Sequence, residues 1–449
     1  MRPTTPSDPG PLPHPDDNLS VWCADKPPYQ PLPPLTGPTS ADVAIIGGGF
    51  TGVSTALELA RRYPERRIVL LEAHQLGHGA SGRNGGLMLN WLHGVESQDL
   101  ELARRIYDTT QAGIDRIVSL IREHRLDVGH RRGGCLEVLT DPRRADAAQA
   151  EVERLHTAGI PLQFLAGPAL DERLRLRGAS GAVLDPGAGH LDGIDFLRGL
   201  RPVLLSLGVS LYEGTPVRGI AEGETVRLGT PGGDVRARAV VLATNAYTPR
   251  LGYFKESLFP LLSHVVATAP LPAERWAELG IGPGLSGFSD DLDRLAYGCL
   301  TTRGQLVFGG GSNAAYSYRL GGRTHGAPSE RAVRAIQRRL TTYFPDTRDL
   351  PLAHRWSGPV ALTLTRMCTM GVRGQHRNIY YALGYSGHGI TLANLAGRVL
   401  CDLYSGDDTP WRGLPFYQQR LHRIPPEPLR WLGYHVYTAL TGRSPRRHL

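Results

Sequence analysis

Apolar and polar residues follow two different rhythms near the start of the folded chain. Residues 43–46 are four consecutive apolar residues, which predict a buried strand. A glycine-rich turn follows, and then apolar residues recur every three or four positions, which predicts a helix over residues 51–63. A second apolar run at 68–71 completes a strand–helix–strand unit. Such units form right-handed parallel crossovers.

The rest of the chain alternates helical and strand-like patterns. An amphipathic helix is predicted at 98–124 and a second helix at 143–157. Strands are predicted at 209–212 and 239–244, strand-like segments with turns over 260–320, and a final strand at 379–383 before a helix at 391–403. We therefore predict an α/β fold. One domain is Rossmann-like with a parallel sheet, and it is interleaved with an α+β domain containing a mostly antiparallel sheet.

The composition is that of a soluble globular protein, with 41% hydrophobic and 20% charged residues over 449 positions. The net charge of +8 is carried almost wholly by arginine, because Lys26 and Lys255 are the only lysines. Basic residues are scattered and interrupted by acids, apart from a cluster at 443–448. Nucleic-acid binding needs a basic stripe on one face, so we expect none.

The cysteines indicate a reducing compartment. There are five, far apart and without a Cys-x-x-Cys pair, so we expect free thiols and a cytoplasmic protein. No signal peptide and no long apolar run is visible, and we expect no stable membrane association. His74 and His78 lie four apart, but Gly77 and Gly79 argue against a helix there and no acid pair completes a ligand set, so no metal site is predicted.

The motif that carries the chemistry lies between the first predicted strand and helix. Gly47, Gly49 and Gly52 form Gly-x-Gly-x-x-Gly, in which the glycines allow a tight turn, close approach of a pyrophosphate, and close packing of helix on strand. Glu72 follows the second strand, where an acid binds ribose hydroxyls. Its carboxylate would repel the 2′-phosphate of NADP. The motif therefore predicts FAD or NAD.

Two further segments distinguish FAD from NAD as the expected cofactor. Residues 77–86, Gly-His-Gly-Ala-Ser-Gly-Arg-Asn-Gly-Gly, follow the acid, and residues 384–389, Gly-Tyr-Ser-Gly-His-Gly, precede the last predicted helix. With the glycine motif and Glu72, they resemble the D-amino-acid oxidase superfamily of FAD-dependent amine oxidases. The resemblance runs from about residue 20 to about 435. It is closest to the γ-glutamylputrescine oxidase branch, with sarcosine and glycine oxidases as more distant relatives.

This resemblance implies FAD as the cofactor and a set of residues that bind it. Val217 would contact adenine, Thr244 the neighbouring loop, and residues 387–389 would direct backbone amides and a helix N-terminus toward the N1/C2=O side of the flavin, which carries negative charge when reduced. From its residue type, Thr391 is expected to cap that helix. The implied cofactor-binding residues are Gly47, Gly49, Phe50, Thr51, Gly52, Glu72, Ser81, Arg83, Asn84, Gly85, Gly86, Val217, Thr244, Gly387, His388, Gly389, Ile390 and Thr391.

The resemblance also implies a domain division. An extended proline-rich segment would occupy residues 1–40, with Trp22 and Tyr29 attaching it to the body, because its many prolines exclude a regular helix. The FAD-binding domain would comprise 41–95, 187–250 and 358–410, the substrate domain 96–186 and 251–357, and a C-terminal extension 411–449.

The sequence differs from related enzymes at positions that bear on the choice of substrate. Sarcosine oxidases have a lysine after the Gly-His-Gly turn and another over the flavin, but neither position is lysine here. An amine without an adjacent carboxylate is therefore favoured over sarcosine, and oxygen reactivity is left open. Cys368 is a candidate flavin tether, but it is displaced from the tethering position of the relatives. Non-covalent FAD is expected.

The implied activity is oxidation of the C–N bond of a primary or secondary amine, or an amino acid, to an imine. A hydride would pass to flavin N5, and oxygen would be reduced to hydrogen peroxide. Two alternatives stay open: a dehydrogenase or tailoring oxidase of a biosynthetic pathway acting on a larger amine or cyclic imine, and a flavin-binding module without turnover. The candidate catalytic residues are His388, His264 and Trp356.

Overall fold

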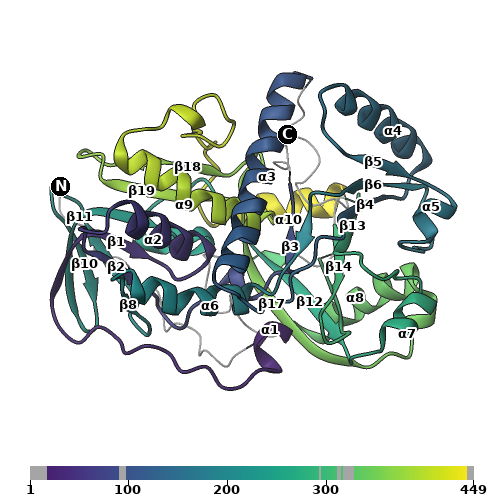
Figure 1. The fold of residues 1–449 in the computed structure, drawn as a ribbon, viewed down its shortest axis with the longest axis horizontal. Coiled ribbons are helices and arrows are strands. Elements are labelled where there is room, and N and C mark those ends of the chain that lie inside the picture. Colours follow the sequence, from purple (N-terminus) through teal and green to yellow (C-terminus); the bar gives the residue numbers. More distant parts are fainter. Residues whose placement is uncertain (1–17, 91–97, 293–294, 311–314, 317–327, 442–449) are drawn as a thin grey trace.

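The computed structural model describes residues 18–90, 98–292, 295–310, 315–316 and 328–441. Two sheets divide the molecule, one in the left half of Figure 1 and one in the right half. The basic cluster at 443–448 and residues 1–17 of the proline-rich segment lie outside the described residues.

The first sheet is mostly parallel. Its strands, in spatial order, are β18 (Thr369–Arg373), β19 (Ile379–Leu383), β11 (Gly233–Leu242), β1 (Thr39–Ile46), β2 (Ile68–Leu71) and β8 (Ser210–Tyr212), with β10 (Val226–Thr230) and β9 (Gly219–Ala221) attached to β11. β1 pairs in parallel with both β11 and β2, and β2 with β8. The predicted strand–helix–strand unit is confirmed.

Helices cover one face of this sheet. α2 (Phe50–Arg62) and α9 (Gly389–Ser405) pack against each other, and α3 (Leu100–Glu123) and α6 (Gly193–Ser206) pack beside them around one apolar core. Burial on both faces explains the uninterrupted apolar runs of β1 and β2. The domain boundaries stay a prediction, but α3, expected in the substrate domain, contributes Ile106, Ile114 and Ile117 to the core of the first sheet.

The second sheet is mostly antiparallel. Its strands, in spatial order, are β16 (Ala315–Tyr316), β12 (Phe259–Thr268), β15 (Leu306–Gly310), β14 (Ala296–Leu300), β13 (Gly287–Asp290), β4 (Cys135–Leu139), β6 (Gly181–Asp185) and β5 (Gln163–Leu165), with β17 (Leu352–Leu362) paired to β12. A separate pair joins β3 (Leu87–Met88) to β7 (Gly189–His190). The predicted fold class, a parallel-rich sheet combined with a mostly antiparallel one, is confirmed.

One face of the second sheet packs on two helices. α7 (Ala273–Glu278) and α8 (Glu330–Tyr343) supply Trp276, Val333 and Ile336 to a core that also contains Phe288 and Phe308 of the sheet. The opposite face includes Val265 and Cys299, which cluster with Ile194 of α6. That opposite face is therefore turned toward α6, one of the helices that cover the first sheet.

The N-terminal segment is attached by the two aromatic residues predicted for that role. The Trp22 indole N–H donates to the Asn84 carbonyl at 2.7 Å, and the Tyr29 hydroxyl donates to the buried Glu213 carboxylate at 3.0 Å. The expectation of no helix is wrong at one place, because α1 (Val21–Ala24) forms a single turn. It forms because no proline lies between positions 16 and 26.

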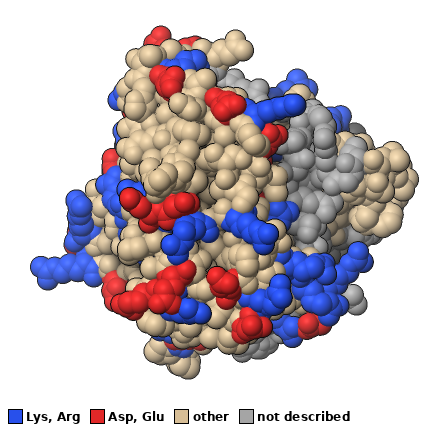
Figure 2. All heavy atoms as spheres, turned by 90° about the vertical axis from the view of Figure 1, so that its right-hand side faces the viewer, with Lys and Arg blue, Asp and Glu red and all other residues tan. Residues whose placement is uncertain are grey.

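The molecular surface mixes charges of both signs. On the side that carries α4 (Pro142–Thr157), α7 and α8, basic and acidic side chains are interspersed, with basic ones gathering toward one lower edge (Figure 2). α10 (Leu429–Thr441) exposes several large apolar side chains. None of the helices in the described ranges is long and apolar enough to cross a membrane.

Candidate functional site

The glycine motif forms the turn between β1 and α2. Gly47 has a φ of +109°, a backbone conformation that favours glycine. A Cβ added at Gly52 would lie 1.8 Å from the Gly47 carbonyl oxygen, so the helix can start this close to the strand only without a side chain. A Cβ at Gly49 would lie 2.7 Å from Ser81 Oγ. The turn and the first residues of α2 line a cavity, where the helix N-terminus favours a negatively charged group.

Glu72 lies directly beside this turn. One carboxylate oxygen accepts a hydrogen bond from the Gly48 amide at 2.6 Å, and the other accepts one from the His74 amide at 2.9 Å. Burial raises the pKa of Glu72 to about 7, although the backbone hydrogen bonds favour the charged form. The carboxylate is therefore fixed in orientation, and its charge depends on pH near neutrality.

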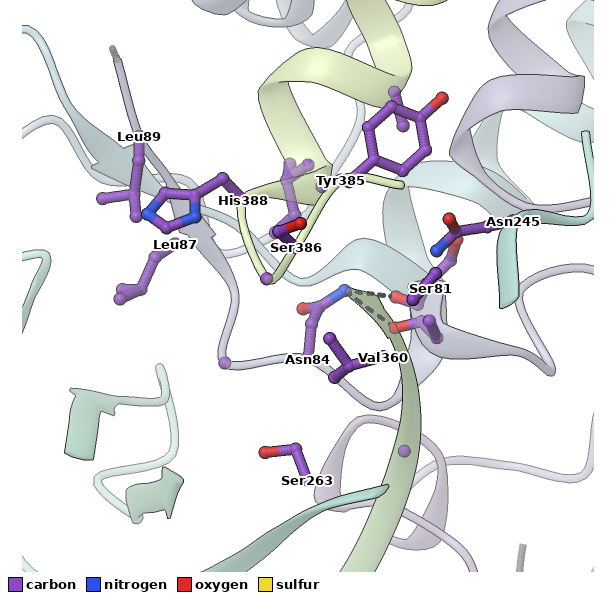
Figure 3. Close-up of a pocket in the computed structure, with 18 of the residues that line it drawn as sticks. Ser81, Asn84, Leu87, Leu89, Asn245, Ser263, Val360, Tyr385, Ser386 and His388 are labelled. Atoms are coloured by element: carbon purple, nitrogen blue, oxygen red, sulfur yellow. Dashed lines mark hydrogen bonds between the residues drawn. The ribbon is translucent and has the colours of Figure 1, made fainter. Parts of the chain in front are cut away.

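The loop after Glu72 crosses the start of α2. Ser81, in a short 3₁₀ turn (Ala80–Gly82), accepts a hydrogen bond from the Phe50 amide at 3.1 Å. The Asn84 side chain donates to the Ser81 carbonyl at 2.7 Å and accepts from the Gly86 amide at 2.8 Å, and Figure 3 shows the bond to Ser81. These bonds hold the loop against the glycine turn.

Arg83 brings a buried positive charge to the same place. The side chain is 6% exposed, and burial lowers its pKa from the usual value. Its Nε has no hydrogen-bond partner among the described residues. A buried guanidinium with an unused donor, next to a glycine turn that admits no side chains, fits the phosphates of a dinucleotide.

The C-terminal glycine loop meets the first turn through one hydrogen bond. The hydroxyls of Tyr385 and Thr51 lie 2.6 Å apart and tie the loop after β19 to α2. α9 begins at Gly389, with His388 as its N-cap residue. The expectation that Thr391 caps this helix is wrong, because Gly389 and Ile390 are already helical and place Thr391 inside the first turn.

These loops and the second sheet enclose one cavity of about 2440 Å³. Pockets for a single small ligand usually measure about 300–1,000 Å³, so this cavity has room for a dinucleotide and a substrate. Figure 3 shows His388, Ser386, Asn84 and Leu87 around its central part. The predicted cofactor residues that line it are Gly47, Gly49, Phe50, Thr51, Glu72, Ser81, Arg83, Asn84, Gly85, Val217, Thr244, Gly387, His388, Gly389 and Ile390.

Three predicted cofactor residues are absent from the described lining. They are Gly52, Gly86 and Thr391. The two glycines have packing roles, because a Cβ at Gly52 would strike Gly47 and a Cβ at Gly86 would lie 2.5 Å from His190 Nε2. They shape the site without facing its interior.

Two of the three catalytic candidates lie outside the described lining. His264 follows Ser263 in β12 and, by strand alternation, points to the face that packs on α8. Trp356 is fully buried, and its indole donates to the Arg83 carbonyl at 3.1 Å. His388 lines the cavity. Of the three, only His388 is placed to touch a bound molecule in this arrangement.

Cys368 is buried in the core of the first sheet. Burial raises the pKa of its thiol to about 12, and the residue is absent from the described cavity lining. A thiol in this position is neutral at physiological pH and poorly placed as a flavin tether. Within the described residues, no group of three potential metal ligands comes together.

Sequence reasoning missed part of the lining. Tyr247 and Arg250 lie in a 3₁₀ helix (Asn245–Leu251) directly after β11, and residues 358–362 come from the end of β17. Tyr247 and Arg250 could have been predicted from the sequence, because ligands bind beyond the carboxyl ends of parallel strands. The second sheet gave no comparable signal, because its lining depends on long-range antiparallel pairing.

The glycine turn, the acid after β2 and the large cavity define a dinucleotide-binding oxidoreductase, and the buried arginine fits its phosphates. The family model for FAD-dependent oxidoreductases of the D-amino-acid oxidase type matches residues 42–403. The chain belongs to this family, and its cofactor is FAD. The resemblance derived from the motifs is confirmed.

Individual relatives cover most of the chain. It is 30% identical over 400 residues to the gamma-glutamylputrescine oxidoreductase of Escherichia coli (strain K12), which spans 86% of this chain and 89% of that protein. It is 31% identical over 390 residues to the probable oxidoreductase OrdL of Haemophilus influenzae, spanning 84% and 86%. The crystal structure of glycine oxidase from Geobacillus kaustophilus superposes with a TM-score of 0.71 at 25% identity, covering 85% of this chain and 99% of that one.

Proposed function

We propose that this enzyme oxidises the C–N bond of an amine, or of an amino acid, to an imine and passes the electrons to oxygen. The observation that carries the proposal is the shared cavity, in which the dinucleotide loops, His388 and the second sheet face the same space. The names of the relatives, a gamma-glutamylputrescine oxidoreductase and a glycine oxidase, support a nitrogen-bearing substrate.

The residues at the loop end of the cavity fit FAD. Glu72 would accept hydrogen bonds from the ribose, the N-terminus of α2 and Arg83 would hold the diphosphate, and residues 387–389 would offer the N-terminus of α9 to negative charge. When bound, FAD accepts the hydride that leaves the carbon next to nitrogen.

The chain contributes orientation and exclusion of water. Leu87 and Leu89 line the cavity near His388, and Val360 lines it by Asn84. These apolar side chains favour the neutral form of an entering amine. A neutral amine needs no dedicated base. His388 is the side chain we assign to a proton-transfer role.

The electron acceptor distinguishes the main proposal from its alternative. Neither lysine lines the described cavity: Lys26 pairs with Asp192 and Asp195 at 2.6 and 2.7 Å, and Lys255 lies by a separate surface pocket. The absence of a lysine from the described lining favours, as the second candidate, a dehydrogenase or tailoring oxidase that acts on a larger amine or cyclic imine and uses another acceptor.

The test is anaerobic reduction of the purified holoenzyme with a panel of amines and amino acids, followed by flavin absorbance. We expect bleaching by at least one amine, and return of the colour with formation of hydrogen peroxide when air is admitted. Bleaching without return of colour in air supports the second candidate. Flavin that no member of the panel bleaches contradicts turnover and supports a flavin-binding module.

A further inference from the structure

Two charged side chains on one face of the second sheet line the cavity: Asp185 of β6, to which the Tyr107 hydroxyl donates at 3.0 Å, and Glu137 of β4. Glu137 lies in the middle of β4, where its neighbours Leu136 and Val138 belong to the core under α8. Side chains alternate between the faces of a strand, so Glu137 points to the other face. Its side chain is accessible from the cavity, although protein surrounds this part of the cavity closely, and it lines the cavity with Val183 of the adjacent strand β6.

The pairing of the strands places Glu137 in line with the cofactor loop. Glu137 is opposite Ser289 of β13, and Ser289 is opposite Tyr297 of β14, so all three share one face. A Cβ added at Gly85 would lie 2.6 Å from the Tyr297 ring, which places this ring against the loop of residues 77–86. Two strand spacings, about 10 Å, separate Glu137 from Tyr297.

The neighbouring carboxylates are already matched by positive charge or by donors. Asp290 lies on the opposite face, where the Tyr343 hydroxyl donates to it. Asp291 forms an ion pair with Arg144 at 2.5 Å. Among the described residues, the Glu137 carboxylate has neither a hydrogen bond nor an ion pair. Arg144, which already pairs with Asp291, acts on Glu137 only through its charge and not through a direct ion pair.

A bound cation would give Glu137 a direct partner. The surrounding protein raises the pKa of Glu137 by burial, and the charges of Asp291 and Asp290 raise it further, whereas Arg144 lowers it. Since an adjacent positive charge favours the ionised carboxyl, binding of a cation and ionisation of Glu137 support each other.

We propose that Glu137 binds a second cationic group of the substrate, so that the preferred substrate is an amine carrying a distal ammonium, such as a diamine or polyamine. The inference rests on the proposed function, because it treats the amine beside the cofactor loop as the one that is oxidised. It assigns Glu137 as the residue that sets specificity at the far end of the cavity.

The experiment compares straight-chain α,ω-diaminoalkanes with n-alkylamines of the same length in anaerobic reduction of the bound flavin. Glu137→Gln should raise the half-saturating concentration of the diamines by roughly 10- to 100-fold, the effect of losing one charged hydrogen bond, and leave the n-alkylamines unchanged. Glu137→Asp, which keeps the charge, should retain much of the preference. Glu151→Gln is the matched control, because this carboxylate also lines the cavity but pairs with Arg154 at 2.6 Å.

Two outcomes overturn the inference: an equal change for both kinds of amine in Glu137→Gln, or no change for either. If no amine reduces the wild-type flavin, the proposed function fails, and calorimetric binding of the same diamines then tests Glu137 without turnover. Binding that Glu137→Gln abolishes and Glu151→Gln retains supports the cation site. Binding that is equal in all three proteins, or absent from wild type, contradicts it.

Discussion

Glu72 should make the affinity for FAD depend on pH. Its carboxyl has a pKa of about 7 in the folded chain and an ordinary value of 4.5. Because the pKa of Glu72 is raised on folding, its protonated form stabilises the folded state. This stabilisation is complete below a pH of about 4.5 and is lost as the pH rises through about 7. The difference between these two pKa values corresponds to about 3 kcal/mol in the free energy of unfolding of the FAD-free protein.

Bound FAD instead favours the ionised form of Glu72. Ribose hydroxyls that donate to Glu72 favour the carboxylate, so FAD binding releases its proton at acidic pH. For a pKa of about 7, the dissociation constant for FAD should fall about tenfold between pH values of about 6 and about 8. Fluorescence quenching of FAD, titrated into FAD-depleted protein at each pH, measures this change.

The substitution Glu72→Gln supplies the control. Both carboxylate oxygens accept backbone N–H groups, from Gly48 and His74, so the amide NH₂ of glutamine would face a donor. The variant should bind FAD more weakly at every pH and without the tenfold change. A dissociation constant that is equal at both pH values in wild type, or that changes equally in the variant, refutes the assigned role of Glu72.

Four further substitutions separate folding from cofactor binding. Gly52→Ala places a Cβ 1.8 Å from a backbone oxygen, so the free energy of unfolding should fall by about 3 kcal/mol or more, seen as a lower Tm. In Gly49→Ala the added Cβ meets only the side chain of Ser81, so the variant should keep its Tm but bind FAD more weakly in titrations. Trp356→Phe loses one hydrogen bond and should lower the free energy of unfolding by about 1 kcal/mol in denaturant titrations, without changing the rate of flavin reduction. In Glu213→Gln the side-chain NH₂ would face the N–H of Leu32 or Leu76, so two donors oppose each other. The free energy of unfolding should fall by about 2 kcal/mol or more, and trypsin should cleave the N-terminal segment faster. Unchanged cleavage would contradict this attachment.

Local patterns explain which parts of the fold were predictable. β1, α2 and β2 follow one another closely, and the glycine turn and Glu72 mark their ends, so sequence alone placed all of them. α1 was missed because one helical turn between prolines has no periodicity to detect. The order of the antiparallel strands depends on pairings between distant residues, such as Cys135 with Asp185, that no local signal reveals.

The same limit applies to the site. Gly47, Gly49 and Glu72 were predicted from their spacing after β1 and β2, which a dinucleotide fixes. The family resemblance implied the other loop residues, and Tyr247 and Arg250 after β11 were missed. Glu137 was missed, because a single glutamate in a strand is recognisable only when its face is known. His264 and Trp356 were chosen from residue type, and the pairing of β12 with β17 determines which face each occupies. Sequence reasoning therefore found the cofactor end of the cavity more completely than the substrate end.

The cavity as an FAD site is the claim on which the rest depends. Titration of FAD-depleted protein with FAD, and in parallel with NAD, tests it most directly through the absorbance and fluorescence of the bound cofactor. We predict saturation at one FAD per chain, release of the intact cofactor on denaturation, and no uptake of NAD. A protein that remains colourless after FAD is added would contradict it.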